Sequence, residues 1–195
     1  STMKKVYLET FGCQMNVSDS ERVATRLTAD GFEITNDEDA ADVILFNTCS
    51  VREKAEQKLF TRVGQVRKTK QNSRAVIGVL GCVAQLEGET LFDRAQGIDF
   101  VLGTHAVGRV GDAIARARNS DGPVVDLGER EDDYDWSVAD SQRNSPFVAF
   151  VPIIEGCNKF CTYCIVPFSR GRERSLPASE IVREVLGLRR KGIRE

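Results

Sequence analysis

The chain has 195 residues, of which 41% are hydrophobic and 29% are charged. This balance is enough to bury a core and excludes an intrinsically disordered chain. The net charge of −2 gives no overall attraction to nucleic acid, so a contact with RNA must come from a local basic patch or from a missing domain. No stretch approaches the roughly 20 apolar residues of a membrane span, and the N-terminus lacks an apolar signal segment. We therefore expect a cytoplasmic protein, with Ser1-Thr2 as a cloning remnant before Met3.

Strand-like and helix-like patterns alternate through the first part of the chain. Strands are predicted at residues 4–10, 32–35, 43–46, 75–80 and 100–102. Helices are predicted from the capping-box pattern Ser18-Asp-Ser-Glu21 to Asp30, and over residues 51–70, 87–95 and 106–118. The alternation predicts an α/β domain over residues 1–118, built on a doubly wound parallel sheet.

Residues 119–145 are polar and acidic, and we interpret them as a linker or surface excursion between two domains. Tyr134 and Trp136 are expected to pack against a neighbouring element. Arg130 is the nearby counter-charge to the acidic side chains of this range, which are Glu129, Glu131, Asp132, Asp133 and Asp135.

Residues 146–195 are predicted to begin a second domain. A strand-like run at 147–154 leads into a cysteine-rich loop, and a helix follows from Ser175 to about Lys191. Gly192-Ile193 indicates the start of a further strand. A barrel needs several such βα units, so we expect a fragment. Three arginines lie between the cysteine-rich loop and this helix, at Arg170, Arg172 and Arg174. They could belong to a solvated loop, or they could contact RNA or a cofactor.

The cysteine-rich loop contains a C-x3-C-x2-C triplet, formed by Cys157, Cys161 and Cys164. Three thiolates at this spacing can hold three irons of a cubane cluster and leave the fourth iron open for chemistry. The alternative is a buried stripe on one face of a helix. Because a strand-like run ends at Gly156 and Pro167 follows soon after, such a helix would be very short, which favours a metal site.

A second set of cysteines follows the first, third and fourth predicted strands, and consists of Cys13, Cys49 and Cys82. Loops at the carboxyl ends of parallel strands line the binding crevice of an open α/β sheet, so these thiols are expected to converge. Each alone would also fit an ordinary buried residue. Without a signal segment, six cysteines favour metal or redox ligands over disulfides. His105 is expected to be a surface or capping residue.

These motifs resemble a known family. The triplet is similar to the signature of radical S-adenosylmethionine (SAM) enzymes. The amino-terminal motifs resemble the N-terminal domain of the methylthiotransferases, and they are Phe11-Gly-Cys-Gln-Met-Asn16, Asn47-Thr-Cys-Ser-Val-Arg52 and Gly81-Cys82. Within that family, Gln14-Met-Asn16, Glu53-Lys-Ala-Glu-Gln-Lys58 and Arg170-Gly-Arg-Glu-Arg-Ser175 are most similar to the tRNA-2-methylthio-N6-dimethylallyladenosine synthase branch.

The resemblance implies two 4Fe-4S clusters and SAM as cofactors. Cys157, Cys161 and Cys164 would hold the radical-generating cluster, which binds SAM, with Tyr163 near the adenine. Cys13, Cys49 and Cys82 would hold an auxiliary cluster that carries the sulfur to be inserted, while a second SAM supplies the methyl group. The substrate would be C2 of N6-isopentenyladenosine beside the anticodon of tRNA, with an electron donor such as a flavodoxin.

The resemblance also implies that the doubly wound sheet is followed by the first βα unit of a truncated radical SAM barrel. Most SAM contacts and the main tRNA-binding surface would lie beyond Glu195, so the fragment is expected to be inactive alone. The alternatives are the sister enzymes that modify a ribosomal-protein aspartate or threonylcarbamoyl-adenosine, a non-catalytic zinc or redox module, and a metal-free flavodoxin-like domain. The sequence does not indicate the oligomeric state.

Overall fold

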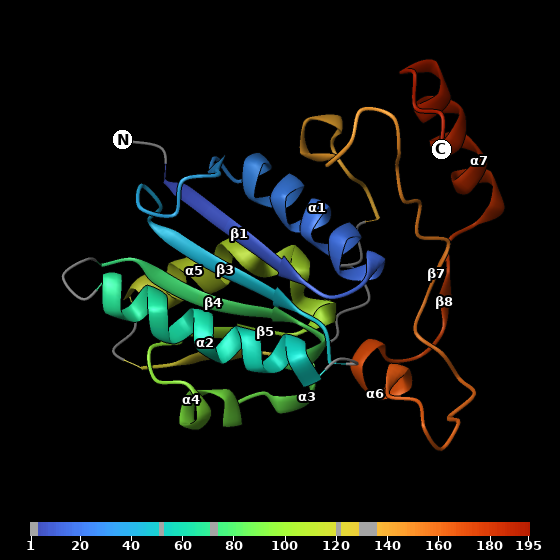
Figure 1. Cartoon of the computed structure of the whole chain (residues 1–195). Helices are drawn as coiled ribbons and strands as arrows, with labels where there is room; N and C mark the ends of the chain where they lie inside the picture. The colour runs from blue at the N-terminus through green and yellow to red at the C-terminus, as the bar shows by residue number, and fades with distance from the viewer. Residues whose placement is uncertain (1–3, 51–52, 71–73, 120–121, 129–135) are drawn as a thin grey trace.

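The computed structural model describes residues 4–50, 53–70, 74–119, 122–128 and 136–195. Within these ranges the main body is a six-stranded, all-parallel sheet in the order β2-β1-β3-β4-β5-β6 (Figure 1). Its strands are β1 (Lys5–Phe11), β2 (Glu33–Thr35), β3 (Val43–Thr48), β4 (Val76–Gly81), β5 (Phe100–Leu102) and β6 (Val124–Asp126). The predicted α/β class and parallel sheet are confirmed.

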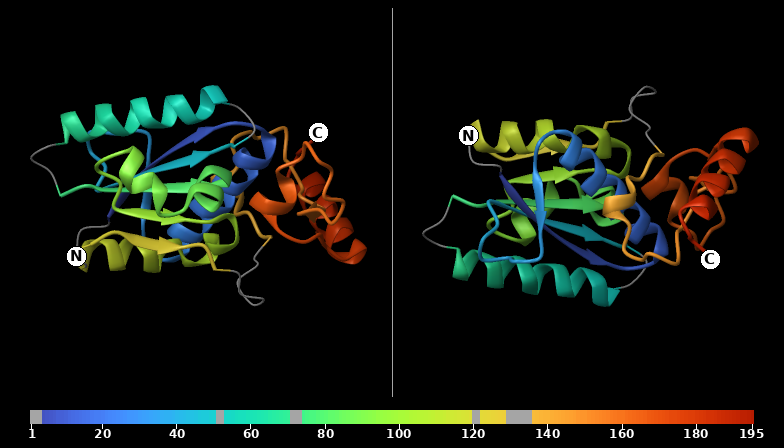
Figure 2. Two further views of the ribbon diagram at one scale, coloured as in Figure 1. Left: turned by 90° about the horizontal axis from the view of Figure 1, so that it is seen from below. Right: turned by 90° about the horizontal axis from the view of Figure 1, so that it is seen from above.

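Helices cover both faces of the sheet, as Figure 2 shows from above and below. One face carries α1 (Gln14–Ala29) and α5 (Val110–Asn119), and the other carries α2 (Glu53–Thr69), α3 (Cys82–Glu87) and α4 (Thr90–Arg94). Successive residues of β3 point to opposite faces, so Val43 and Leu45 enter the core under α1, while Ile44 and Phe46 enter the core under α2. The sheet is therefore doubly wound, as predicted. No helix in the described ranges is long and apolar enough to cross a membrane.

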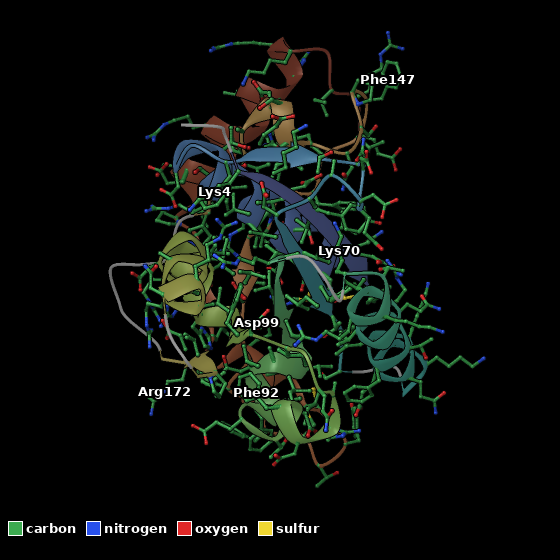
Figure 3. The ribbon with its side chains drawn as sticks, turned by 90° about the vertical axis from the view of Figure 1, so that its left-hand side faces the viewer. Lys4, Lys70, Phe92, Asp99, Phe147 and Arg172 are labelled. Atoms are coloured by element: carbon green, nitrogen blue, oxygen red, sulfur yellow. The ribbon has the colours of Figure 1, made fainter. Side chains whose placement is uncertain are left out.

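The amino ends of the strands are tied together by carboxylates from the loops between elements. Asp42 accepts the backbone N–H of Lys5 at 2.9 Å, and Asp99 accepts that of Ile77 at 2.8 Å. Figure 3 looks onto this end of the sheet, with Asp99 near its centre. Burial raises the pKa of Asp99, while the N–H of Ile77 and the charge of Arg67 lower it. These bonds satisfy strand N–H groups that would otherwise begin the ladder unpaired.

Helix α1 begins about one turn before the predicted start. The sequence pattern places the start at Ser18, but the extended residue before the helix is Cys13, with φ −100° and ψ −179°. The side-chain oxygen of Asn16 accepts the backbone N–H of Cys13 at 3.4 Å, which fixes the first turn. Ser18 and Glu21 instead belong to a buried polar run inside the helix.

Two further helices differ from the predicted ranges. The helix predicted over 87–95 is divided into α3, which begins at Cys82 directly after β4, and α4. Gly88 separates them with a φ of +51°, which a helix cannot continue through. The helix predicted over 106–118 is preceded by a 3-10 turn, η1 (Thr104–Arg109), and becomes α5 only at Val110.

The range predicted as an acidic linker contains the sixth strand of the sheet, β6, which pairs with β5. Trp136 lines a cavity together with Val151 and Leu176 of the following segment. Residues 129–135, which include most of the acidic side chains of the predicted linker, lie outside the described residues. They are Glu129, Arg130, Glu131, Asp132, Asp133, Tyr134 and Asp135.

The segment 146–195 lies at the carboxyl ends of the strands (Figure 1). It contains β7 (Ile154–Glu155), α6 (Val166–Arg170), β8 (Arg174–Ser175) and α7 (Ala178–Arg190). Most of the strand-like run 147–154 forms no regular strand in the described structure. However, Ala149 donates to the carbonyl of Glu195 at 2.8 Å, and Glu195 donates to that of Phe147 at 3.1 Å. This pairing is the pattern of parallel strands joined through a helix, as expected for a βα unit.

Gly78 in β4 gives a test of how tightly the sheet packs. A methyl group there would lie 2.2 Å from Cζ of Phe100 in β5. We expect Gly78→Ala to lower the free energy of unfolding by about 1–3 kcal/mol, because the core must shift to accept the methyl. Urea denaturation measures the effect.

Gly64→Ala in α2 is the matched control, since no atom lies within 4 Å of the added methyl. Alanine favours a helix over glycine by about 1 kcal/mol, so this variant should unfold at the same or higher urea concentration. Equal midpoints for Gly78→Ala and the parent protein would contradict the packing described.

Candidate metal centres and their interface

Cys13 and Cys49 lie at the point where the strand order of the sheet reverses. β1 and β3 are neighbours, but α1 after β1 covers one face and α2 after β3 covers the other. The two connections diverge here, and such switch points are where open α/β sheets bind ligands. Cys13 follows β1 and Cys49 follows β3, so both residues lie at this switch point.

Strand register brings Cys82 to the same place. Phe11 is paired with Thr48, and Thr48 with Gly81, so Cys49 and Cys82 occupy the next position of adjacent strands. The backbone N–H of Cys49 extends this ladder by donating to the carbonyl of Phe11 at 3.1 Å. Neighbouring strands lie about 4.8 Å apart, so the three cysteine-bearing ends span roughly 10 Å.

Gly12 allows the close approach of these strand ends. Its φ is +136°, and a methyl group there would lie 2.4 Å from Cβ of Cys49 and 2.7 Å from Oδ1 of Asn16. Any side chain would therefore push the turn that carries Cys13 away from Cys49. The Gly12-Cys13 turn is consequently part of the cysteine site rather than a simple connection.

Two buried asparagines, Asn16 and Asn47, hold the Gly12-Cys13 turn in place through hydrogen bonds. Asn47 donates through Nδ2 to the carbonyl of Asn16 and to Oγ of Ser20, both at 2.9 Å. Asn16 donates to Oδ1 of Asn47 at 3.4 Å, and its own Oδ1 accepts the thiol of Cys13 at 3.3 Å. The sequence places both asparagines in family motifs but does not predict this role. The position of Asn47 at the end of the apolar run of β3, two residues before Cys49, is the signal that could have indicated it.

The three thiols differ in exposure. Cys13 is exposed, whereas Cys49 and Cys82 are buried, and all are free thiols. Burial raises the pKa of Cys82, the nearby guanidinium of Arg170 lowers it, and the carboxylate of Asp19 raises it again. Across the described part of the chain, no group of three or more His, Cys, Asp or Glu side chains is arranged to hold a metal ion. The three strand ends lie side by side. Convergence of the three thiols and metal binding by them stay predictions.

The C-x3-C-x2-C triplet lies on a loop between β7 and α6, so the helical-stripe alternative is wrong. The N–H of Cys164 donates to the carbonyl of Cys161 at 2.9 Å, which forms a tight turn at the end of the triplet. Cys161 is exposed, while Cys157 and Cys164 are half-buried. A loop that presents three accessible thiols suits a cluster-binding role better than a packed helix would.

Aromatic side chains of this loop point outward. Tyr163 is 90% exposed, so it does not pack into the protein core. Phe160, with an unusual φ of +49°, contacts Phe168 edge to face at a ring-centre distance of 5.9 Å. The strained backbone at Phe160 lies between Cys157 and Cys161, where it sets the direction of the loop.

Arg170 joins the triplet segment to the sheet domain through buried ion pairs. Its guanidinium lies 2.6 Å from a carboxylate oxygen of Asp19 in α1 and 3.0 Å from one of Glu155 in β7. Arg22 of α1 adds longer contacts to Asp19 at 3.5 Å and to Glu155 at 3.7 Å. We call these four residues the interface network. All four are buried, so the solvated-loop alternative is wrong for Arg170.

The charged groups of this network shift one another's pKa values. Burial raises the pKa of Glu155, as does Asp19, and the two arginines lower it. Burial alone would lower the pKa of Arg170, but Asp19, Cys82 and Glu155 outweigh it and hold the pKa above its usual value. Arg170 is therefore a permanent positive charge inside the interface.

The remaining residues of the interface lie beside this network. Thr104 donates from Oγ1 to the carbonyl of Ser169 at 2.6 Å. His105 is half-buried against Gly171, and its pKa is lowered by burial and then by Arg174 and Arg170. His105 is thus neither a surface residue nor a helix cap, contrary to the prediction.

Comparison with known proteins agrees with these features. Residues 5–103 match the uncharacterized protein family UPF0004. The chain belongs to this family. It is 44% identical to the tRNA-2-methylthio-N(6)-dimethylallyladenosine synthase of Fervidobacterium nodosum, over 98% of this chain and 43% of that protein. For the proteins of the same name in Thermotoga petrophila and Cronobacter sakazakii, the identities are 45% and 42%, each over 98% of this chain and over 42% and 41% of the relative.

The predicted branch of the methylthiotransferase family is therefore confirmed. The chain spans about two fifths of the length of the curated relatives it matches. The matched portion includes both cysteine trios, because the alignments extend over nearly all of this chain.

Thiol labelling tests the placement of the cysteines. In the metal-free protein kept reduced, Cys13 and Cys161 are exposed, while Cys49 and Cys82 are buried. We expect a thiol reagent to modify the exposed pair roughly tenfold faster or more, because buried thiols react only after local opening. Mass spectrometry of peptides after timed quenching identifies the labelled residues.

In denaturant all six thiols should react at similar rates, which serves as the control. Fast labelling of Cys49 and Cys82 in the folded protein would show that the carboxyl ends of β3 and β4 are open, contrary to the structure.

Proposed function

We propose that this chain carries the cluster-binding part of a radical SAM methylthiotransferase. The reaction adds a methylthio group to C2 of N6-isopentenyladenosine next to the anticodon of tRNA. The names of the relatives support this substrate over the ribosomal-protein alternative. The observation that carries the proposal is the placement of two cysteine trios beside one interface, one on the strand ends and one on the facing loop.

The two cysteine trios supply donor atoms of the kind that iron–sulfur clusters use. Thiolates are the usual ligands of iron in such clusters, and neither trio has a fourth cysteine, since the sequence contains six. Cys13, Cys49 and Cys82 would hold the auxiliary 4Fe-4S cluster, and Cys157, Cys161 and Cys164 the radical SAM cluster. When bound, the clusters and SAM supply the radical and sulfur-transfer chemistry that acid–base side chains cannot perform.

The side chains around the first trio position its ligands. Asn16 and Asn47 fix the turn of Cys13 against the end of β3 through buried hydrogen bonds. Oγ1 of Thr10 and Oγ of Ser20 lie 2.6 Å apart and continue this bonded set into β1. Such support keeps ligand positions within the narrow range that a rigid cluster requires.

The second trio depends on the interface for its position. The N–H of Cys157 donates to the carbonyl of Gly171 at 3.1 Å, and Thr104 holds Ser169 from the sheet domain. Tyr163 presents an exposed ring beside the last thiol of the triplet, where it would stack on the adenine of SAM. The exposed positions of Cys161 and Tyr163 leave this side of the loop accessible to a cofactor.

The proposal includes further partners and a division of the chain. An electron donor such as a flavodoxin would reduce the clusters, and tRNA would bind mainly through parts of the enzyme beyond this chain. Residues 1–118 would form the methylthiotransferase N-terminal domain, and residues 146–195 the start of the radical SAM domain. β6 extends the sheet beyond residue 118, so we place the end of the first domain after Asp126.

Iron loading tests the proposal directly. We expect anaerobic reconstitution of the parent chain with iron and sulfide to give two clusters, or about eight iron atoms. Replacing Cys157, Cys161 and Cys164 by alanine should leave about four, because the other trio still binds. Iron and sulfide analysis with visible absorption measures both states.

The complementary variant, with alanine at Cys13, Cys49 and Cys82, should likewise retain about four iron atoms. A colourless parent protein that binds zinc stoichiometrically would instead identify the structural zinc module. Loss of all iron in either triple variant would contradict two independent sites.

A further inference from the structure

The outer face of α2 carries an exposed row of basic and polar side chains. Intervals of four and three residues keep this row on one face of the helix, opposite the face that packs on the sheet. Its members are Lys54, Lys58, Thr61, Gln65 and Lys68, and we call them the α2 stripe. Figure 2 shows that α2 lies along the outside of the sheet, so the stripe meets solvent.

The stripe starts at the end of the sheet that carries the first cysteine trio. Helix α2 begins four residues after Cys49, and Nζ of Lys58 lies 5.1 Å from the ring centre of Phe11, at the carboxyl end of β1. Lys68 follows Lys54 by 14 positions, which corresponds to about 21 Å at the rise of an α-helix. An elongated ligand that reaches the strand ends therefore has a row of donors beside it along α2.

The three lysines of the α2 stripe are not paired with carboxylates. Within the described ranges, no ion pair joins Lys54, Lys58 or Lys68 to an acidic side chain. The chain as a whole has a net charge of −2, so this face differs in sign from the average of the molecule. Positive charge that no acidic side chain of the described residues balances is available to a negatively charged partner.

Acidic side chains on and beside α2 are bound by arginines instead. The ion pairs join Arg62 to Glu9 and Glu38 on one flank of the helix, and Arg94 to Glu56 and Glu87 on the other. The Arg62–Glu9 contact measures 2.9 Å and the Arg94–Glu87 contact 3.2 Å. These pairs neutralise carboxylates that would otherwise repel a negatively charged ligand of the stripe.

The first two lysines of the stripe belong to a motif whose role the fold does not explain. Three segments resemble the tRNA branch of the family. One of them contains Asn16, which supports the cysteine turn, and another contains Arg170 of the interface network. In the third segment, residues 53–58, Lys54 and Lys58 face solvent. A partner outside the chain would give these two side chains a function.

We propose that the α2 stripe binds the phosphate backbone of the RNA substrate while the base to be modified lies at the cysteine-bearing strand ends. The inference rests on the proposed function, which supplies RNA as the substrate. Lysine, threonine and glutamine side chains donate hydrogen bonds to phosphate oxygens, and such contacts position a nucleic acid without reading its sequence. A straight row of donors suits a base-paired stem, which proteins contact through its phosphates and its shape.

A solvated helix face and a docking site for an acidic protein are the competing explanations. Exposed lysines contribute to solubility without binding anything. An acidic electron donor would also complement the charge of the stripe. However, the core of a protein–protein interface is enriched in aromatic residues and depleted of lysine, and the α2 stripe has no apolar member. This composition favours RNA over a protein partner.

The salt dependence of RNA binding tests the stripe. A fluorescently labelled RNA hairpin with isopentenyladenosine in its loop is titrated with the metal-free chain, and anisotropy gives the Kd at several salt concentrations. Each lysine that contacts a phosphate adds about one unit to the slope of log Kd against log salt concentration. We expect the double variant Lys54→Gln, Lys58→Gln to lower this slope by about two and to weaken binding at low salt roughly tenfold or more. Glutamine forms helices about as well as lysine, so α2 should stay folded.

The double variant Lys4→Gln, Lys191→Gln is the matched control. It removes the same charge from two exposed lysines outside α2, so its slope should equal that of the parent chain. Equal slopes for the α2 variant and the parent would overturn the inference, and so would a parent chain that binds no RNA at low salt. An α2 variant that loses only the binding of an acidic electron donor would overturn it as well.

Failure of the stripe and failure of the proposed function give different results, because RNA binding is measured without metal. A chain that takes up two clusters but binds RNA equally well without Lys54 and Lys58 would refute the stripe and leave the clusters in place. A chain that binds RNA through α2 but takes up no iron would instead contradict the proposed function.

Discussion

The register of three adjacent parallel strands is the constraint on which the site depends. β1, β3 and β4 end level with one another, at Phe11, Thr48 and Gly81, and each is followed within two residues by a cysteine. A shift of one residue in either pairing would turn the buried side chains of β3 to the wrong face and separate the thiols at the same time. Selection for a packed core and selection for converging cysteines therefore act on the same hydrogen bonds.

The molecule uses two different kinds of contact for its two parts. Apolar side chains fill both faces of the sheet. Hydrophobic burial is non-directional, so these contacts do not by themselves fix the exact orientation of the helices on the sheet. The contact between the sheet domain and residues 146–195 instead relies on charges and hydrogen bonds, which require defined distances. Apolar packing makes the domain stable, while the interface network gives its two cysteine-bearing parts a defined relative position.

Much of this arrangement follows from local sequence patterns. The continuous apolar runs of β3 and β4 predict buried parallel strands, and the position of each cysteine after a strand predicts convergence at one edge. Pattern reading does not predict Asn16 and Asn47 as a bonded pair, because their contacts join residues that are 31 positions apart. It fails at Ser18–Glu21 for a related reason: a buried polar run inside a helix has the composition of a helix start. The sequence that follows Arg170 is rich in charged residues, as in a solvated loop. Only the fold shows that Asp19 and Glu155 face the Arg170 side chain.

The carboxylates that tie the amino ends of the strands have a practical consequence. Asp42 and Asp99 bond backbone groups at the end of the sheet opposite to the cysteines. The length of β4 separates the Asp99 bond at Ile77 from Cys82, so the two ends can change independently. Substitutions near Asp42 or Asp99 can therefore adjust the melting temperature while they leave the cysteine-bearing ends of the strands unchanged.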